Sequence, residues 1–345
     1  MNFPTNILLT GAGFTKNFGG LLASEIWSRL FNDGAVRKSG LAKVVSAHAP
    51  DFERAYQELV RSDPDSDSAR VLHGAVVRAF DEMDLVLRTW YHTNNAPESG
   101  TLTRLFELCA PKLGTGETGL LFTLNQDLYP ERKTFLDLAF GCPGILAVGP
   151  PPGLQGSYFE NHDMQPVHGR DIKRCPDKDT IATCAKSWLQ PGGFHWVKLH
   201  GSCNWRSSDG RDVMVLGHDK TGQIASEPLL TWYWKVFREA LGSARHRLIV
   251  IGYSFRDPHV NEVIARSIQG HGTELVVIDP TSWEVLEARI ATADPCYGPT
   301  INERLEGASG SRHLPYDLVT VFSRSEGSTT PEWKRLRALL EAPLP

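Results

Sequence analysis

The stretch "LLTGAGFTKNFGG", from Leu8 to Gly20, joins an apolar run to a helical pattern through a glycine turn. An α/β protein builds a phosphate-binding loop in this way, because the loop amides and the helix N-terminus attract anions. The dinucleotide-binding fingerprint has glycines at its first, third and sixth positions. Gly11 and Gly13 fit the first two, but Lys16 occupies the sixth. The stretch therefore predicts either a nucleotide site of another kind or only a tight turn.

Further apolar runs along the chain have the length and composition of buried strands in a parallel sheet. Helical patterns, such as those at 21–31 and 231–242, separate these runs. The alternation predicts a doubly wound, Rossmann-like α/β fold with a parallel sheet. We expect strands at residues 6–10, 119–124, 195–200, 247–252, 274–279 and 317–322.

Two long stretches interrupt the alternation and divide the expected domain. Residues 35–115 keep a helical apolar stripe and predict a helical insertion. Residues 141–194 are rich in glycine, proline and polar residues, which indicates a partly irregular insertion or lid. The expected α/β domain would then span residues 1–325, and residues 326–345 would form a short terminal helix and tail.

The composition excludes several classes of protein. With 41% hydrophobic residues, 22% charged residues and a net charge of −4, the chain has no strongly basic surface, so we expect no direct nucleic-acid binding. No apolar run approaches the ~20 residues of a membrane span, and the N-terminus lacks the basic region of a signal peptide. The six cysteines are scattered, without a CxxC pair, which suits a reducing cytoplasm.

Carboxylate and amide side chains follow two of the expected strands. Asn125 and Asp127, in "FTLNQD", lie two residues apart and would share a face in extended backbone. Asp279, in "VVIDP", could accept hydrogen bonds from a ribose hydroxyl. Ligands of open α/β sheets bind at this edge. Asn and Asp are also favoured in turns, so all three side chains could simply be turn residues.

His200, in "VKLHGSCNW", ends another expected strand and precedes a glycine. A single histidine is more often structural than functional. This one, however, is predicted to stand at the same edge of the sheet as the glycine turn and Asn125, which strengthens the case for a functional role without excluding a structural one.

The stretch "IVIGYSFRDPHVNEVI", residues 249–264, follows a buried strand into a helix. Gly252 and Ser254 are the candidates for ligand contact. Asp257 precedes a proline and is expected to cap the helix, so we expect structural roles for Asp257 and His259.

These stretches, in this order, resemble the sirtuin family, and more closely its bacterial antiphage-defence branch. "GAGFT" is similar to the family's GAG-x-S/T loop, and "TLNQD" to its T-x-N-x-D motif. "KLHGS" resembles the segment of the catalytic histidine, and "IGYSFRDPHVNEVI" the G-[TY]-S segment. "VVIDP" lies where the family holds the adenosine ribose. The opening stretch then looks like an NAD site that needs no glycine at its sixth position.

The resemblance implies NAD as the substrate and gives each matched residue a role. Asn125 would orient the ribose and a water molecule, Asp127 would contact the nicotinamide carboxamide, and His200 would act as general base or polarise a ribose hydroxyl. Asp279 would hold the adenosine ribose. The phosphates would lie against Gly11, Ala12, Gly13, Thr15, Gly252 and Ser254, and no metal is expected.

Two departures from the family bear on the activity. Deacylase sirtuins carry a zinc module with two cysteine pairs and a G-[IV]-P-D-F-R segment after the first loop, and this chain has neither. The resemblance to the defence branch implies hydrolysis of NAD to nicotinamide and ADP-ribose, as a gated effector that depletes NAD during infection. A deacylase without the zinc module and a non-enzymatic NAD or ADP-ribose sensor are the alternatives.

Partners follow from the need to gate such an activity. The family pairs similar chains with HerA-type ATPases, short Argonaute proteins or other sensors, and we expect a separate activating partner of this kind. We also expect a homo-oligomer, because the helical insertion and the aromatic cluster at 232–234 could supply apolar surface, although both could simply be core.

The cysteine spacing predicts a protein without structural zinc. The closest pair in the sequence, Cys175 and Cys184, is nine residues apart, which does not match the spacing of zinc-binding pairs. Metal analysis of chelator-treated, folded protein is expected to give no stoichiometric zinc. Zinc retained at one equivalent would contradict this and favour the deacylase alternative.

Overall fold

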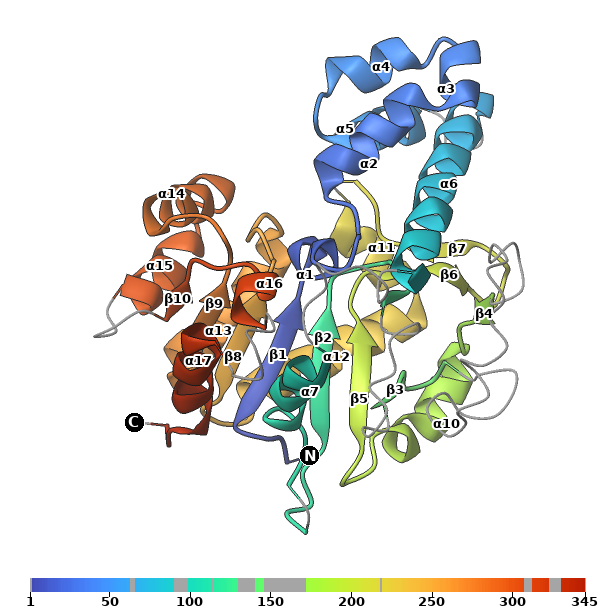
Figure 1. The fold of residues 1–345 in the computed structure, drawn as a ribbon. Coiled ribbons are helices and arrows are strands. Elements are labelled where there is room, and N and C mark those ends of the chain that lie inside the picture. The colour runs from blue at the N-terminus through green and yellow to red at the C-terminus, as the bar shows by residue number, and fades with distance from the viewer. Residues whose placement is uncertain are drawn as a thin grey trace.

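A computed structural model gives the fold, with a parallel β-sheet between two layers of helices (Figure 1). The structure describes residues 2–62, 66–89, 99–112, 114–129, 140–145, 172–217, 219–306, 312–322 and 330–344.

The main sheet has seven strands in the order β10-β9-β8-β1-β2-β5-β3, and every neighbouring pair is parallel. The chain runs outward from β1 through β2 to β5, and then returns to the other side of β1 for β8, β9 and β10. This reversal confirms the predicted doubly wound, Rossmann-like order. The strands are β1 (Asn6–Thr10), β2 (Gly119–Thr123), β3 (Phe140–Gly141), β5 (Phe194–Lys198), β8 (Arg247–Ile251), β9 (Glu274–Ile278) and β10 (His313–Leu314).

Both faces of the sheet are covered, so its central strands read as continuous apolar runs. In β1, Leu8 packs into one core, and Ile7 and Leu9 pack into the other. The core on the first face also contains side chains of α1 (Ala12–Lys16), α2 (Ala23–Asn32), α3 (Gly34–Lys38), α4 (Ala42–Ala47), α5 (Phe52–Ser62), α6 (Asp67–Thr89), α7 (Ser99–Glu107), α16 (Leu318–Val321) and α17 (Pro331–Glu341). The second is covered by α10 (Lys178–Trp188), α11 (Lys220–Ser226), α12 (Pro228–Gly242), α13 (Pro258–His271), α14 (Trp283–Ala293) and α15 (Gly298–Glu306).

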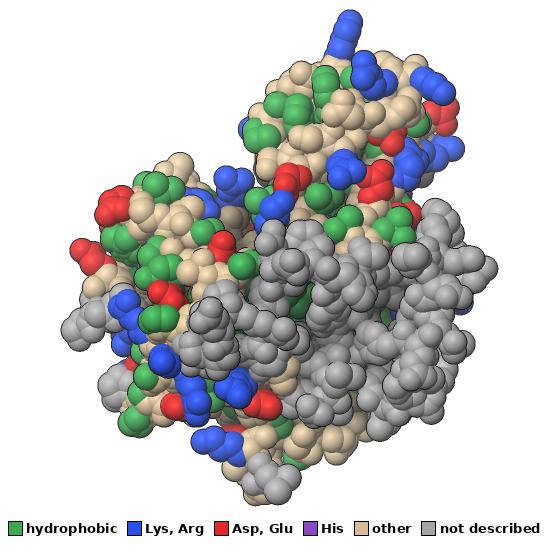
Figure 2. Space-filling view, viewed as in Figure 1, with side chains coloured by type: hydrophobic (Ala, Val, Ile, Leu, Met, Phe, Trp, Pro, Cys, Tyr) green, Lys and Arg blue, Asp and Glu red, His purple; other side chains and the backbone are tan. Residues whose placement is uncertain are grey.

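Helices α2 to α6 form a lobe beyond the carboxyl ends of the strands (Figure 1). Arg78 of α6 pairs with Asp33 at 2.8 Å, and Trp27 Nε1 of α2 donates to the Val45 carbonyl at 2.7 Å. Positive and negative side chains are interspersed on the visible surface of this lobe (Figure 2). Even α6, with 23 residues, is not apolar enough for a membrane span, and no other described helix qualifies.

A second sheet of three strands continues directly from β5. It consists of β4 (Lys173–Arg174), β6 (Gly201–Arg206) and β7 (Asp212–Met214), in the order β4-β6-β7. Gly201 turns the chain from one sheet into the other, with φ of +74° and the Val213 carbonyl oxygen only 2.0 Å from where a Cβ would lie. Within the predicted irregular insertion, α10 is helical, while residues 146–171 lie outside the described residues.

The strand predicted at 317–322 is wrong, because residues 318–321 form helix α16. Asp317 accepts a hydrogen bond from the Thr320 amide at 2.7 Å and so caps that helix. The last strand of the sheet lies just before it, at β10.

The aromatic cluster of α12 belongs mainly to the core. Tyr233 and Trp234 are fully buried, and Trp232 is partly buried against the same core. These side chains therefore supply no large exposed apolar surface.

The loops after β1 and β8 touch through their backbones. A Cβ on Gly13 would lie 2.7 Å from Gly252 Cα, and a Cβ on Gly252 would lie 2.3 Å from the Gly13 carbonyl carbon. Gly252 also has φ of +62°, in the left-handed region that side chains disfavour. The sheet edge at this point has no room for side chains on either glycine.

The substitution Gly252→Ala is expected to destabilise the protein by about 2–4 kcal/mol, because it adds left-handed strain to a backbone clash. Gly34→Ala is the control, since a Cβ there meets no atom within 4 Å, and it is expected to change stability by less than about 1 kcal/mol. Urea unfolding of both variants measures the difference. Equal stability of the two variants would contradict the close contact.

Candidate active site

The candidate site lies where the winding of the sheet reverses, at the carboxyl ends of β1, β2, β5 and β8. Ligands of doubly wound sheets bind in the crevice at such a point. Each strand ends in one residue that the sequence singled out: Gly11 after β1, Asn125 after β2, His200 after β5 and Gly252 after β8.

Asn125 ties the loop after β2 to the loop after β1. Its Nδ2 donates to the Gly11 carbonyl at 2.9 Å and to Thr15 Oγ1 at 3.3 Å, and its own amide donates to Thr123 Oγ1 at 3.0 Å. Asn125 is 7% exposed and Thr15 is 2% exposed. Among the described residues, none donates a hydrogen bond to Asn125 Oδ1, so this oxygen is the part of the amide left for a ligand.

Two backbone amides of the glycine loop already donate hydrogen bonds within the protein. The amide of Gly11 donates to the Ile251 carbonyl at 3.0 Å, and that of Gly13 donates to the Gly252 carbonyl at 2.9 Å. These two glycines are thus needed for contact between loops, whatever they bind. Ala12 is exposed and Gly13 is half-buried, so this side of the loop remains accessible.

Asp127 is buried and caps its own turn. Its Oδ1 accepts from the Tyr129 amide at 2.9 Å, and its carbonyl accepts from Lys198 Nζ at 2.6 Å. This contact suits the turn role weighed for Asp127, and no described hydrogen bond joins its carboxylate to Asn125.

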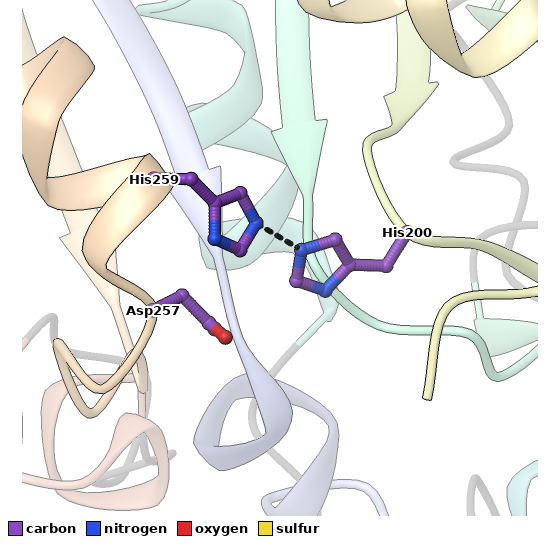
Figure 3. Close-up of side chains that lie close together, drawn as sticks. All are labelled: His200, Asp257 and His259. Carbon is purple, nitrogen blue, oxygen red and sulfur yellow. Dashed lines mark hydrogen bonds between the residues drawn. The ribbon is translucent and has the colours of Figure 1, made fainter. Parts of the chain in front are cut away.

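His200 lies at the start of the Gly201 turn and is 3% exposed. Its Nε2 is 3.1 Å from Nε2 of His259, the second residue of α13 (Figure 3). The ring of Trp234 lies beside both histidines, with centroids 6.4 Å from His200 and 4.9 Å from His259. Two histidines from opposite halves of the sheet therefore meet at the switch point.

Burial lowers the pKa of His200 from 6.5 to about 3 and also lowers the pKa of His259. The Asp257 carboxylate opposes both shifts but does not overcome them. Both rings are therefore neutral near pH 7. In a hydrogen bond between two neutral imidazoles, one Nε2 carries the proton and the other accepts it.

Asp257 occupies the N-cap position of α13, as predicted, but the prediction for its side chain is wrong. The carboxylate accepts no hydrogen bond from the helix. Its Oδ1 instead lies 2.8 Å from Lys220 Nζ, which in turn lies 2.9 Å from Glu53 Oε2. The ion pair outcompetes the cap because a buried carboxylate gains more from a full opposite charge than from an amide.

The three charged groups shift one another's protonation. Burial acts to raise the pKa of Asp257, but the Lys220 ammonium outweighs it and holds that pKa below its usual range. Burial acts to lower the pKa of Lys220, and the carboxylates of Glu53 and Asp257 raise it instead. Burial raises the pKa of Glu53 despite Lys220. Asp257 is thus the ionised carboxylate beside the two histidines.

The loop that carries Ser254 is held in an unusual conformation. Phe255 has φ of 58°, which is uncommon for a residue with a side chain, and it is fully buried. Asn261 Nδ2 donates to the Phe255 carbonyl at 2.8 Å, and Tyr253 Oη donates to Asn261 Oδ1 at 3.0 Å. This network fixes the direction of the loop and leaves Ser254 half-buried beside Gly252.

Asp279 follows β9 and is buried among partners of its own. Its Oδ1 accepts from the amide of Thr281 at 3.0 Å, and its Oδ2 lies 3.2 Å from Arg289. The turn role weighed for this residue is the one that the geometry favours.

His200, Asp257 and His259 are also the described group best arranged to hold a metal ion. One ligand atom from each lies within 4.8 Å of the others. The Lys220 ammonium already contacts Asp257, however, and supplies the positive charge that a metal would bring.

The sequence correctly predicted that Asn125 and His200 lie at one edge of the sheet. It did not assign His259, Lys220 or Glu53 to the site. A histidine two residues after an N-cap aspartate was the available signal for His259. No local pattern marks Lys220 or Glu53, because each reaches the site from a helix distant in sequence.

The histidine pair predicts a pH dependence of stability. The pKa of His200 is lower in the folded protein than the 6.5 of an unperturbed histidine, so unfolded chains bind more protons below about pH 6.5, and stability falls there. Between about pH 7.5 and pH 5, the lowered pKa of His200 is expected to reduce the free energy of unfolding by at most ~2 kcal/mol.

In His200→Gln, the loss of unfolding free energy over the same pH range is expected to be smaller than in the wild type. His271→Gln, which replaces an exposed histidine at the end of α13, is the control. Urea unfolding at the two pH values measures this. An unchanged pH dependence in His200→Gln would contradict the burial of a neutral ring.

No curated protein matches the chain. The family model described as "SIR2-like domain" matches residues 162–293, a segment that contains His200, Gly252, Asp257, His259 and Asp279. The loop after β1 and Asn125 lie outside the matched segment but are brought to the same edge by the sheet. The match over this segment, which holds both histidines, supports a likeness to sirtuins and suggests a function related to NAD.

Proposed function

We propose that the chain binds NAD at the switch point of the sheet and hydrolyses it to nicotinamide and ADP-ribose. The observation that carries the proposal is that Asn125, bonded to the glycine loop of β1, and His200 follow the carboxyl ends of neighbouring parallel strands, on a scaffold with a SIR2-like match. SIR2-like domains bind NAD, which makes the nicotinamide–ribose bond the natural target of these side chains.

The reaction requires little acid catalysis and one base. The bond between the anomeric carbon and the pyridinium nitrogen breaks with its electron pair going to nitrogen, so nicotinamide leaves neutral. The ribose becomes an oxocarbenium-like cation, and water forms the new C–O bond and loses a proton. In the proposal, Asn125 Oδ1 orients the ribose or the water, and His200 accepts the proton.

The remaining candidates supply binding. The accessible backbone of Ala12 and Gly13, with Gly252 and Ser254, forms the wall proposed to lie against the phosphates. The proposal leaves Asp127 and Asp279 as turn residues that shape the neighbouring loops, since their carboxylates accept from nearby amides.

The proposal extends to a biological role as a gated effector of antiphage defence that depletes NAD. Unregulated hydrolysis would kill the host, so a homo-oligomer and a separate activating partner, such as a HerA-type ATPase, a short Argonaute or another sensor, belong to it. The resemblance of the motifs to that branch is what supports this part.

The variants Asn125→Ala and His200→Ala are each expected to lower nicotinamide release by ~10²–10⁴-fold. NAD binding is expected to weaken far less, because the loop residues at 11–15 remain. The double variant is expected to be little worse than the worse single one, because groups that act as a unit are not additive. Nicotinamide release by purified protein, with any activating partner, measures the first effect, and calorimetric titration with NAD the second.

Gln126→Ala is the matched control. Gln126 neighbours Asn125, is 9% exposed and donates to the Val215 carbonyl at 2.6 Å, so its loss disturbs the same loop without touching the proposed chemistry. Hydrolysis by a folded Asn125→Ala protein at the wild-type rate would show that the site lies elsewhere. Release that requires an acylated peptide would favour the deacylase instead.

A further inference from the structure

We propose that His259 is a positioning residue that holds His200 in the one tautomer able to take a proton at Nδ1, with the Asp257 carboxylate stabilising the charge that follows. This inference deepens the proposed hydrolysis and rests on it for its catalytic part.

The hydrogen bond between the two rings allows two tautomers of His200, and only one of them fits the proposed reaction. Nε2 of His200 faces Nε2 of His259 at 3.1 Å, and no described residue bonds to His200 Nδ1. If His259 donated, His200 would carry its proton on Nδ1 and would have no lone pair left to accept another. His200 can be a base only when it donates from Nε2 to His259, which leaves the lone pair on Nδ1.

The proton balance then assigns roles to the neighbours. As water attacks the anomeric carbon, its O–H bond breaks and the proton joins His200 Nδ1. The resulting imidazolium donates from Nε2 to His259 in a charge-assisted hydrogen bond. Asp257 is the strongest charged influence on His200 and favours its protonated form more than Lys220 opposes it. In this arrangement His259 takes the place of the orienting partner of a general base, and the Asp257 carboxylate acts on it through charge, with ligand atoms of all three residues within 4.8 Å of one another.

Packing holds both rings in place before any substrate binds. Trp234 lies against both, and its own Nε1 donates to the Leu199 carbonyl at 2.9 Å. His259 is fixed by the first turn of α13, after the strained Phe255. The remaining charged groups that act on His259, apart from Asp257 and Lys220, are Arg238 and Glu262.

The test combines histidine NMR with kinetics on the full chain. Imidazole ¹⁵N–¹H correlation spectra report which nitrogen of His200 carries the proton, with His200→Gln used to assign the signals. In the wild type we expect the Nε2–H form of His200. In His259→Phe, which removes the acceptor, we expect a mixture of forms and a kcat for nicotinamide release lowered about tenfold to a hundredfold, with KM for NAD little changed.

Two further variants separate positioning from folding. His259→Gln keeps a carbonyl oxygen that can accept from His200 Nε2, and we expect it to recover kcat to within about tenfold of the wild type. His246→Phe removes another buried histidine, at the amino end of β8, which pairs with Ser243 and the Pro4 carbonyl. It is expected to lower stability without changing kcat or the His200 tautomer.

Three outcomes would overturn the inference: a wild-type His200 protonated at Nδ1, wild-type kcat in folded His259→Phe, or stoichiometric Zn²⁺ or Mn²⁺ binding that moves both histidine signals and is required for turnover. If the wild type hydrolyses no NAD under any condition, the proposed function fails. The NMR comparison of wild type and His259→Phe still decides the tautomer on its own.

Discussion

The whole site depends on the direct contact between two loop backbones at the centre of the sheet. Gly11 and Gly13 after β1 lie against Gly252 after β8, at distances that leave no space for side chains. Because β1 and β8 are the neighbouring strands at which the winding reverses, this contact closes the floor of the crevice. It also sets the separation between the half of the sheet that carries Asn125 and His200 and the half that carries His259.

Buried polar groups give the site its particular chemistry. An unpaired charge would be costly at this depth, so the ionised carboxylate of Asp257 is matched by Lys220 and the imidazoles stay neutral. Two neutral histidines in contact can transfer a proton between their rings without first releasing one to solvent. The arrangement thus combines a low-dielectric surrounding with two uncharged rings, each of which keeps one nitrogen lone pair at neutral pH.

The sequence allowed the fold class, the central strands and the convergence of Asn125 with His200 to be predicted, because buried parallel strands have unmistakable apolar runs and their carboxyl ends share an edge. The prediction of a strand at residues 317–322 failed because an apolar run of this length suits a strand or a short helix. Only the cap formed by Asp317 decides between the two. The prediction that the Asp257 side chain caps α13 failed because its partner, Lys220, lies 37 residues away in sequence, beyond the reach of any local capping rule.

Glu53 couples the helical lobe electrostatically to the histidine pair. It belongs to α5, yet it shares Lys220 with Asp257, so three alternating charges run from the lobe to the histidine pair. If α5 shifted away from α11, Lys220 would keep Asp257 as its one counter-ion among the described residues and would neutralise that carboxylate more completely. The field that favours a proton on His200 would then weaken. A displacement of α5 from α11 would therefore change the basicity of His200 through these charges alone.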